Sequence, residues 1–222
     1  MKLNINNILQ NIQNTEVKNK PFNHLIIYNL LPGVFYKKLA RELHDEKFVN
    51  KYVRAPYGNK ERYGVDITDY FLWKSNGRKI PTTIHNENYK CLLSGGNNNL
   101  KDFVNVLLQN QKQFYSLLCK KLPTERIQKN YFFHINMTKD SVGYKIGPHT
   151  DDKENIFTIL FYVPEDDKNK KFGLQICDQK IDFIPNRMVI FAPSKPGENR
   201  PPTWHQVNCL TNDIIGTRNS FQ

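Results

Sequence analysis

Short apolar runs separated by turn residues characterise the chain from residue 131 onward. Val, Ile, Phe and Tyr dominate the runs, and Pro, Gly, Asn and Asp separate them. Such spacing is typical of an all-β sandwich or barrel, which we therefore expect here. The predicted strands cover 131–137, 155–163, 173–177, 181–184, 187–192, 203–209 and 213–220.

The earlier part of the chain has helical spacing instead. Apolar residues at every fourth position predict a helix over 33–49, and a longer stripe predicts a second helix over 100–121 that ends at Pro123. The apolar stretch 22–31 predicts a strand, and the polar, Asn-rich stretch 1–20 predicts a marginal helix. Helices that precede a β core in this way are expected to pack on its outer face.

We therefore expect a single domain over 1–222 that is mainly β with supporting helices. In this interpretation about 1–125 form the helical support and a lid region, and about 126–222 form the core. Scattered Tyr, Gly, Pro and Asn in 50–98 predict loops and short elements, which could cover a site and select its substrate.

The charge of the chain favours an anionic partner. Lys and Arg number 32 and Asp and Glu 21, which leaves a formal net charge of +11. A uniform lysine bias is also typical of an ordinary solvated surface, and the chain shows no known aromatic–basic recognition motif. Nucleic acid therefore ranks last among the candidate partners.

Cysteine spacing and hydropathy narrow the class of protein further. The four cysteines are far apart, without a C-x-x-C pair, so we expect reduced, mostly buried thiols and no zinc ribbon. No apolar run approaches the ~20 residues of a membrane span. The first residues lack the pattern of a secretory signal, so we expect a cytoplasmic protein.

Five residues of the predicted β region suggest chemistry. His149 and Asp151 are two positions apart, so on a strand both would point to one side. With His205 they make two imidazoles and a carboxylate, a set that binds one face of ferrous iron and leaves the other open. Arg218 and Ser220 supply a planar cation and a hydroxyl, which suit the carboxylate of a co-substrate.

These residues resemble a known pattern. From about 132 to 220 the chain is similar to the iron(II)/2-oxoglutarate-dependent dioxygenase superfamily, in particular to its small prolyl-hydroxylase-like members. The most specific segment is Tyr-Lys-Ile-Gly-Pro-His-Thr-Asp at 144–151. The resemblance implies a double-stranded β-helix, or jelly roll, with supporting helices.

The resemblance also implies a role for each residue. His149, Asp151 and His205 would bind Fe(II) and so be the catalytic residues. Arg218 and Ser220 would bind the distal carboxylate of 2-oxoglutarate, and Tyr144 and Asn136 are candidates for lining the co-substrate or substrate pocket. One departure is the spacing, because Arg218 lies 13 residues after His205, slightly more than usual in the family.

The implied activity is oxidative. With Fe(II), 2-oxoglutarate and O₂, the enzyme would hydroxylate a C–H bond of a peptidyl residue or small metabolite and release succinate and CO₂. The alternative is a non-catalytic or isomerase-type metal-binding jelly roll of the cupin kind, which needs no C-terminal Arg-x-Ser. Metal binding without affinity for 2-oxoglutarate would favour that alternative.

Overall fold

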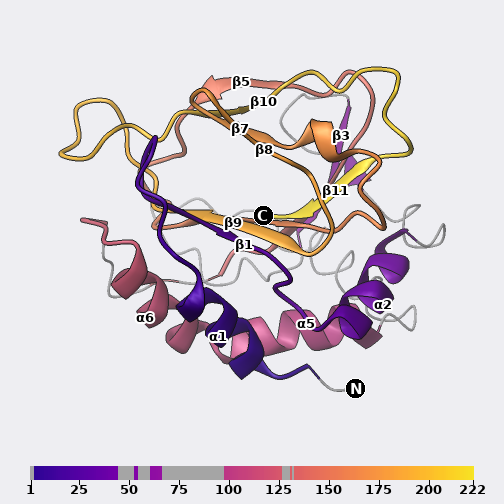
Figure 1. The fold of residues 1–222 in the computed structure, drawn as a ribbon, viewed down its shortest axis with the longest axis horizontal. Coiled ribbons are helices and arrows are strands. Elements are labelled where there is room, and N and C mark those ends of the chain that lie inside the picture. Colours follow the sequence, from indigo (N-terminus) through magenta and orange to yellow (C-terminus); the bar gives the residue numbers. More distant parts are fainter. Residues whose placement is uncertain (1–2, 45–52, 55–60, 67–97, 127–130, 132) are drawn as a thin grey trace.

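The larger of two antiparallel sheets forms the middle layer of the protein, between a layer of helices and a smaller sheet (Figure 1). The computed structural model describes residues 3–44, 53–54, 61–66, 98–126, 131 and 133–222. No helix among these residues is long and apolar enough to cross a lipid bilayer.

The larger sheet has seven strands in the order β1-β9-β6-β11-β4-β3-β2. Every neighbouring pair in it is antiparallel. Two of its strands, β2 and β3, come from the segment that was expected to hold only loops and short elements, and β3 pairs with β4 in full register. The strands are β1 (His24–Ile27), β2 (Val53–Arg54), β3 (Arg62–Asp66), β4 (Asn136–Asp140), β6 (Thr158–Tyr162), β9 (Arg187–Phe191) and β11 (Arg218–Phe221).

The smaller sheet has four strands in the order β5-β10-β7-β8. From β4 onward the chain passes repeatedly between the sheets, so that β5 lies in the small sheet, β6 in the large one, β7 and β8 in the small one, β9 in the large one, β10 in the small one and β11 in the large one. This alternation is a jelly roll, and it confirms the predicted fold class. The four strands are β5 (Ile146–His149), β7 (Leu174–Ile176), β8 (Gln179–Ile181) and β10 (His205–Val207).

Side-chain alternation divides the core into two parts. Leu160, Tyr162 and Val189 point between the sheets, whereas Phe161 and Ile190 point toward the helices. Strands β6 and β9 are therefore apolar on both faces, which explains why the run at 155–163 is nearly continuous in the sequence.

Within the described residues, four helices cover the outer face of the large sheet (Figure 1). Phe103 of α5 packs on Phe161 and Phe221, with ring centroids 5.5 and 5.2 Å away, and so joins this layer to the sheet. The helices are α1 (Ile5–Asn14), α2 (Gly33–His44), α5 (Asn98–Gln109) and α6 (Gln111–Lys121), and a short 3-10 helix, η2 (Lys170–Phe172), precedes β7.

The prediction of one helix over 100–121 is wrong. The helical run is interrupted at Asn110, whose backbone is not helical. Its side-chain amide donates to the Val106 carbonyl at 2.8 Å. An asparagine that bonds the backbone in this way competes with helix continuation. The predicted helix over 33–49 is described only to His44, because residues 45–52 lie outside the described part.

Two strand boundaries and the cysteine expectation also need correction. Strand β4 begins at Asn136 rather than 131, and β11 begins at Arg218 rather than 213. In the second case Thr211 and Asp213 form a hydrogen-bonded turn where a strand was expected. The thiols are not mostly buried, since Cys177 and Cys209 are exposed, Cys119 is half-buried and Cys91 lies outside the described residues.

Candidate metal centre

The two histidines are brought together by pairing in the small sheet. His149 ends β5 and His205 begins β10, and the two residues are direct partners across these antiparallel strands. Their ring centroids are 4.2 Å apart and the rings are tilted by 52°. Residues 56 positions apart in the sequence thus become neighbours.

Backbone carbonyls fix which nitrogen of each ring faces the site. His149 Nδ1 lies 2.9 Å from the Gly147 carbonyl oxygen, and His205 Nδ1 lies 3.0 Å from that of Thr203. A carbonyl only accepts, so in each ring Nδ1 carries the hydrogen and donates it. The Nε2 lone pairs are left for a metal, with each ring held in orientation as in known metal sites.

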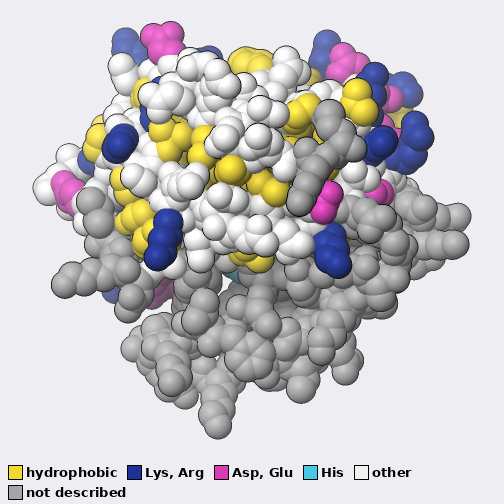
Figure 2. All heavy atoms as spheres, turned by 90° about the horizontal axis from the view of Figure 1, so that it is seen from below, with side chains coloured by type: hydrophobic (Ala, Val, Ile, Leu, Met, Phe, Trp, Pro, Cys, Tyr) yellow, Lys and Arg dark blue, Asp and Glu magenta, His cyan; other side chains and the backbone are white. Residues whose placement is uncertain are grey.

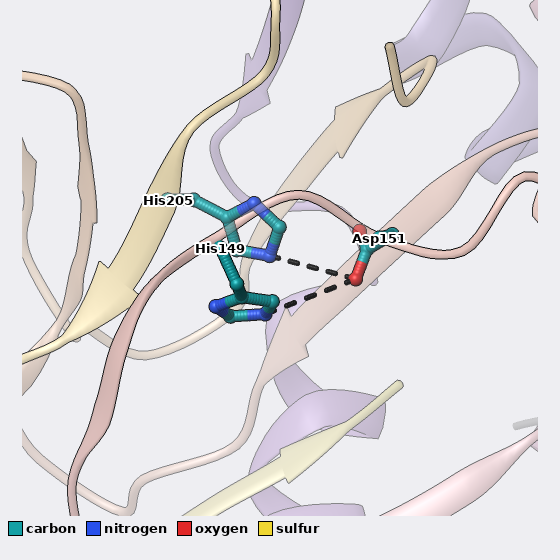
Figure 3. A group of neighbouring side chains, drawn as sticks. All are labelled: His149, Asp151 and His205. Atoms are coloured by element: carbon teal, nitrogen blue, oxygen red, sulfur yellow. Dashed lines mark ion pairs between the residues drawn. The ribbon is translucent and has the colours of Figure 1, made fainter. Parts of the chain in front are cut away.

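Asp151 completes the group (Figure 3). Its Oδ1 lies 3.9 Å from His149 Nε2 and 3.6 Å from His205 Nε2. The expectation that strand alternation aims Asp151 at this point is wrong, because β5 already ends at His149. Its Oδ2 instead accepts the Thr158 hydroxyl at 2.5 Å, and Thr158 is the first residue of β6 in the large sheet.

The donor set fits Fe(II). Single ligand atoms from His149, Asp151 and His205 lie within 4.8 Å of one another. Burial lowers the pKa of His205, and His149 acts in the same direction, although Asp151 and the Thr203 carbonyl oppose them. The ring therefore stays neutral at physiological pH, as a ligand must be.

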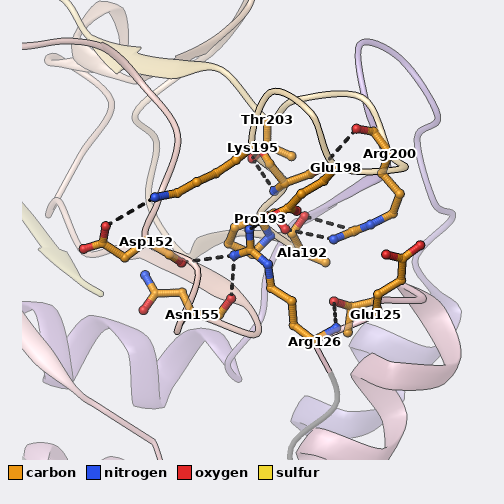
Figure 4. Close-up of polar contacts among 12 residues, drawn as sticks. Glu125, Arg126, Asp152, Asn155, Ala192, Pro193, Lys195, Glu198, Arg200 and Thr203 are labelled. Carbon is orange, nitrogen blue, oxygen red and sulfur yellow. Dashed lines mark hydrogen bonds and ion pairs between the residues drawn. The ribbon is translucent and has the colours of Figure 1, made fainter. Parts of the chain in front are cut away.

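Arg126 holds the segment that follows Asp151 (Figure 4). Its Nη1 donates to the carbonyls of Asp152 and Asn155, at 3.0 and 3.1 Å, and its Nη2 pairs with Glu198 at 2.6 Å. Lys195 lies 3.6 Å from the Asp152 carboxylate. These contacts join the segment that follows Asp151 to the segment that precedes His205.

Arg200 stabilises the same region from the other side. Its Nη2 donates to the Pro193 carbonyl at 2.8 Å, just before Ser194, whose backbone N–H donates to the Thr203 hydroxyl at 3.0 Å. Thr203 in turn provides the carbonyl that orients His205. The orientation of this histidine therefore depends on a chain of contacts beyond its own strand.

The predicted co-substrate residues lie deeper between the sheets. Arg218 is buried, its Nη1 pairs with Asp140 at 2.7 Å, and its Nε donates to the Phe172 carbonyl at 2.9 Å. Ser220 is also buried, and its hydroxyl lies 3.0 Å from that of Thr138. Within the described part of the chain, neither residue forms a hydrogen bond or ion pair with the triad.

Tyr144 and Asn136 occupy the same interior. Tyr144 is buried, which raises its pKa to about 12, and the Arg62 guanidinium lies 4.3 Å above its ring. Asn136 begins β4, and its buried Oδ1 has no hydrogen-bond partner among the described residues. The unpaired atom is an acceptor, so a partner for it would have to donate a hydrogen.

Four residues that bear on the site were missed by reasoning from sequence: Thr158, Asp140, Arg62 and Arg126. Thr158 lies within the strand predicted over 155–163 and could have been suspected as a polar residue inside a nearly continuous apolar run. The other three have no local signal in the sequence, because their partners lie 26 to 78 positions away.

Comparisons with known proteins agree on the fold. No protein-family model matches the chain, and no curated protein matches it. The structure is similar to a prolyl-4-hydroxylase from Pseudomonas putida, with a TM-score of 0.52, 10% identity and coverage of 96% of this chain and 94% of that one. It is also similar to a prolyl hydroxylase from Trichoplax adhaerens, solved in complex with a peptide fragment of the hypoxia inducible factor oxygen degradation domain. There the TM-score is 0.53, the identity 14% and the coverage 97% of this chain and 86% of that one. The chain therefore has the fold of the prolyl hydroxylases, which is the jelly roll that the resemblance to iron(II)/2-oxoglutarate-dependent dioxygenases implied.

Proposed function

We propose that this protein is an Fe(II)/2-oxoglutarate-dependent dioxygenase that hydroxylates a C–H bond of a peptidyl residue or small metabolite. The observation that carries the proposal is the convergence of His149, Asp151 and His205, with both Nδ1 atoms held by carbonyls and the Nε2 atoms facing one carboxylate oxygen. Bound iron would supply oxygen activation, with 2-oxoglutarate as the electron donor and succinate and CO₂ as its products.

In this proposal the co-substrate lies along the inner face of the large sheet. Ser220 pairs with Tyr162, which lies four positions after Thr158 on β6. At about 3.3 Å per residue, Ser220 is therefore about 13 Å along the sheet from Thr158, which holds the candidate ligand Asp151. Arg218 would bind the distal carboxylate from there, and Ser220 would donate to the same group. The unpaired Oδ1 of Asn136 is an acceptor, so it would suit a donor group on the substrate rather than 2-oxoglutarate. Tyr144 lies at the Arg62 end of the same interior.

The substrate follows less directly from the structure. The Trichoplax adhaerens neighbour is bound to a peptide, which supports a peptidyl substrate here. On the helical face in Figure 2, basic side chains of the described residues stand apart or beside acidic ones, and no continuous basic surface covers that part. That face therefore gives no support for binding of a nucleic-acid duplex, which is bound by a basic stripe.

Succinate release tests the proposal. Anaerobically iron-loaded protein, given 2-oxoglutarate, O₂ and a library of peptides and metabolites, should release succinate with at least one of them. His149→Ala should abolish that release, whereas His134→Ala is the matched control, because His134 is exposed and lies outside the triad. Unchanged turnover in His149→Ala would refute the assignment.

One observation favours a metal-binding jelly roll that is not an oxygenase. Arg218 is already paired with Asp140, so its charge is engaged before any co-substrate arrives. If calorimetry on the metal-loaded protein detects no binding of 2-oxoglutarate, this second function replaces the first.

A further inference from the structure

Three charged side chains meet at the end of the interior away from the triad. Asp140 of β4 is fully buried and accepts from Arg62 of β3 and from Arg218 of β11. These residues are register partners, since Asp140 faces Arg62 on one side and Arg218 on the other. The cluster is thus part of the sheet itself and does not depend on loop conformation.

The two arginines do not hold Asp140 equally. Arg62 contacts both carboxylate oxygens, with Nε 2.6 Å from Oδ1 and Nη2 3.0 Å from Oδ2. Arg218 contacts Oδ2 alone, through Nη1 at 2.7 Å. A two-point pair between guanidinium and carboxylate is the stronger and better oriented arrangement. Asp140 would therefore remain held if Arg218 turned away from it.

Counting only the residues that the structure describes, the cluster carries one unmatched positive charge. Among the described residues, both guanidiniums form their ion pairs with the same carboxylate. The neighbouring phenols do not offset the surplus, because burial raises the pKa of Tyr144 to about 12 and also raises that of Tyr162, so both stay neutral. An uncompensated charge in the interior is costly, and a second carboxylate would remove that cost.

We propose that Arg62 is a positioning residue that holds Asp140, so that Arg218 is free to bind the distal carboxylate of the co-substrate. The inference rests on the proposed function. Without Arg62, Asp140 would keep Arg218 and compete with the ligand for it. Arg62 is placed for this role by β3 and by the face of Tyr144, over which its guanidinium lies at 4.3 Å.

The test is a cycle of Arg62→Met, Asp140→Asn and the double variant. Each protein is loaded with Mn(II), and its affinity for 2-oxoglutarate and for 2-oxobutanoate, which lacks the distal carboxylate, is measured by calorimetry. Arg62→Met should weaken 2-oxoglutarate binding about tenfold or more and leave 2-oxobutanoate unchanged. The double variant should return within about threefold of the wild type, because the competing charge is gone. Arg41→Met, which changes an exposed arginine on α2, is the matched control.

A purely structural role for Arg62 gives different results. It predicts that Arg62→Met weakens binding of 2-oxoglutarate and of 2-oxobutanoate equally, and that the double variant does not recover. It also predicts that Asp140→Asn alone weakens 2-oxoglutarate binding. Any of these results overturns the inference. Thermal midpoints and Mn(II) affinities identify misfolded variants. If Arg62→Met does not fold, Asp140→Asn and the double variant decide, because neither leaves a buried unpaired carboxylate. Absence of 2-oxoglutarate binding in the wild type would instead refute the proposed function, which distinguishes the two failures.

Discussion

The Thr158 hydroxyl donates to Oδ2 of Asp151 at 2.5 Å, and this bond turns the other carboxylate oxygen toward the two imidazoles. The threonine belongs to the large sheet, whereas His149 and His205 belong to the small one. The third ligand of the candidate centre is therefore positioned by the sheet opposite to the one that carries the histidines.

Thr158→Val should weaken metal binding. The change removes the donor but keeps the shape, and loss of such an orienting partner typically costs about 10–100-fold in metal affinity. Titration with Mn(II) or Co(II) measures the effect. Thr211→Val is the control, since Thr211 also donates to an aspartate, Asp213, but at an exposed turn. Equal affinities in the two variants would contradict the role given to Thr158.

Arg126→Met should also lower metal affinity, by about threefold to tenfold, with little change in global stability. The change removes the contacts to Asp152, Asn155 and Glu198, so the segment that carries Asp151 has more conformations available. Metal titration together with limited proteolysis of the metal-free protein provides the measurement. Lys168→Met, at an exposed pair with Asp166, should change neither result.

Reasoning from sequence succeeded where chemistry and strand pattern coincide. A β core was predicted because short apolar runs alternate with turn residues, and the jelly roll was implied by the resemblance around 144–151. The same resemblance singled out His149 and His205, which the structure brings together. The orientation of Asp151 was not accessible, since it depends on Thr158 across the space between the sheets.

The pairing of Arg218 was likewise beyond the sequence. Arg218 suited a ligand carboxylate, but nothing local indicates that Asp140 lies beside it, because that contact depends on the register of β4 against β11. The break at Asn110 was missed because the apolar stripe continues through both helices. Periodicity reports which face is buried and does not report a local side-chain bond such as that of Asn110.

Stability should fall on acidification because two histidines are buried in their neutral form. Burial is the main cause that lowers the pKa of both His24 and His205. Below the unfolded-state pKa of 6.5, the unfolded chain binds more protons than the folded one. The contribution of these histidines to the free energy of unfolding is therefore fully present above that pH, and it decreases as pH falls toward their pKa values in the folded state.

Urea unfolding of the metal-free protein at about pH 7.5 and about pH 5.5 measures this dependence. His24→Gln should reduce the loss of stability between the two conditions, because it removes one of the two buried neutral imidazoles. A loss of the same size in His24→Gln and in the wild type would show that His24 does not titrate on unfolding.

Phe161→Ala should destabilise the protein by about 3–5 kcal/mol, the usual cost of emptying a large aromatic site in a core. The ring is buried between the helices and the large sheet, with centroids of Tyr36, Phe103 and Phe221 at 6.2, 5.5 and 6.1 Å. Denaturant unfolding measures the change. Val34→Ala, at a position that is 62% exposed, should cost well under about 1 kcal/mol.

The two ends of the sandwich are closed by different means. At the deep end, Arg218 donates to the Phe172 carbonyl and the Leu174 amide donates to the Tyr162 hydroxyl, so the chain itself ties one sheet to the other. At the triad, the sheets are joined by the bond from Thr158 to Asp151 and by the packing of the Phe191 ring on His205, with centroids 5.1 Å apart. An ion bound by His149, His205 and Asp151 would join the histidines of the small sheet to a carboxylate that Thr158 holds from the large sheet, so its loss would weaken this end of the sandwich and leave the deep end joined.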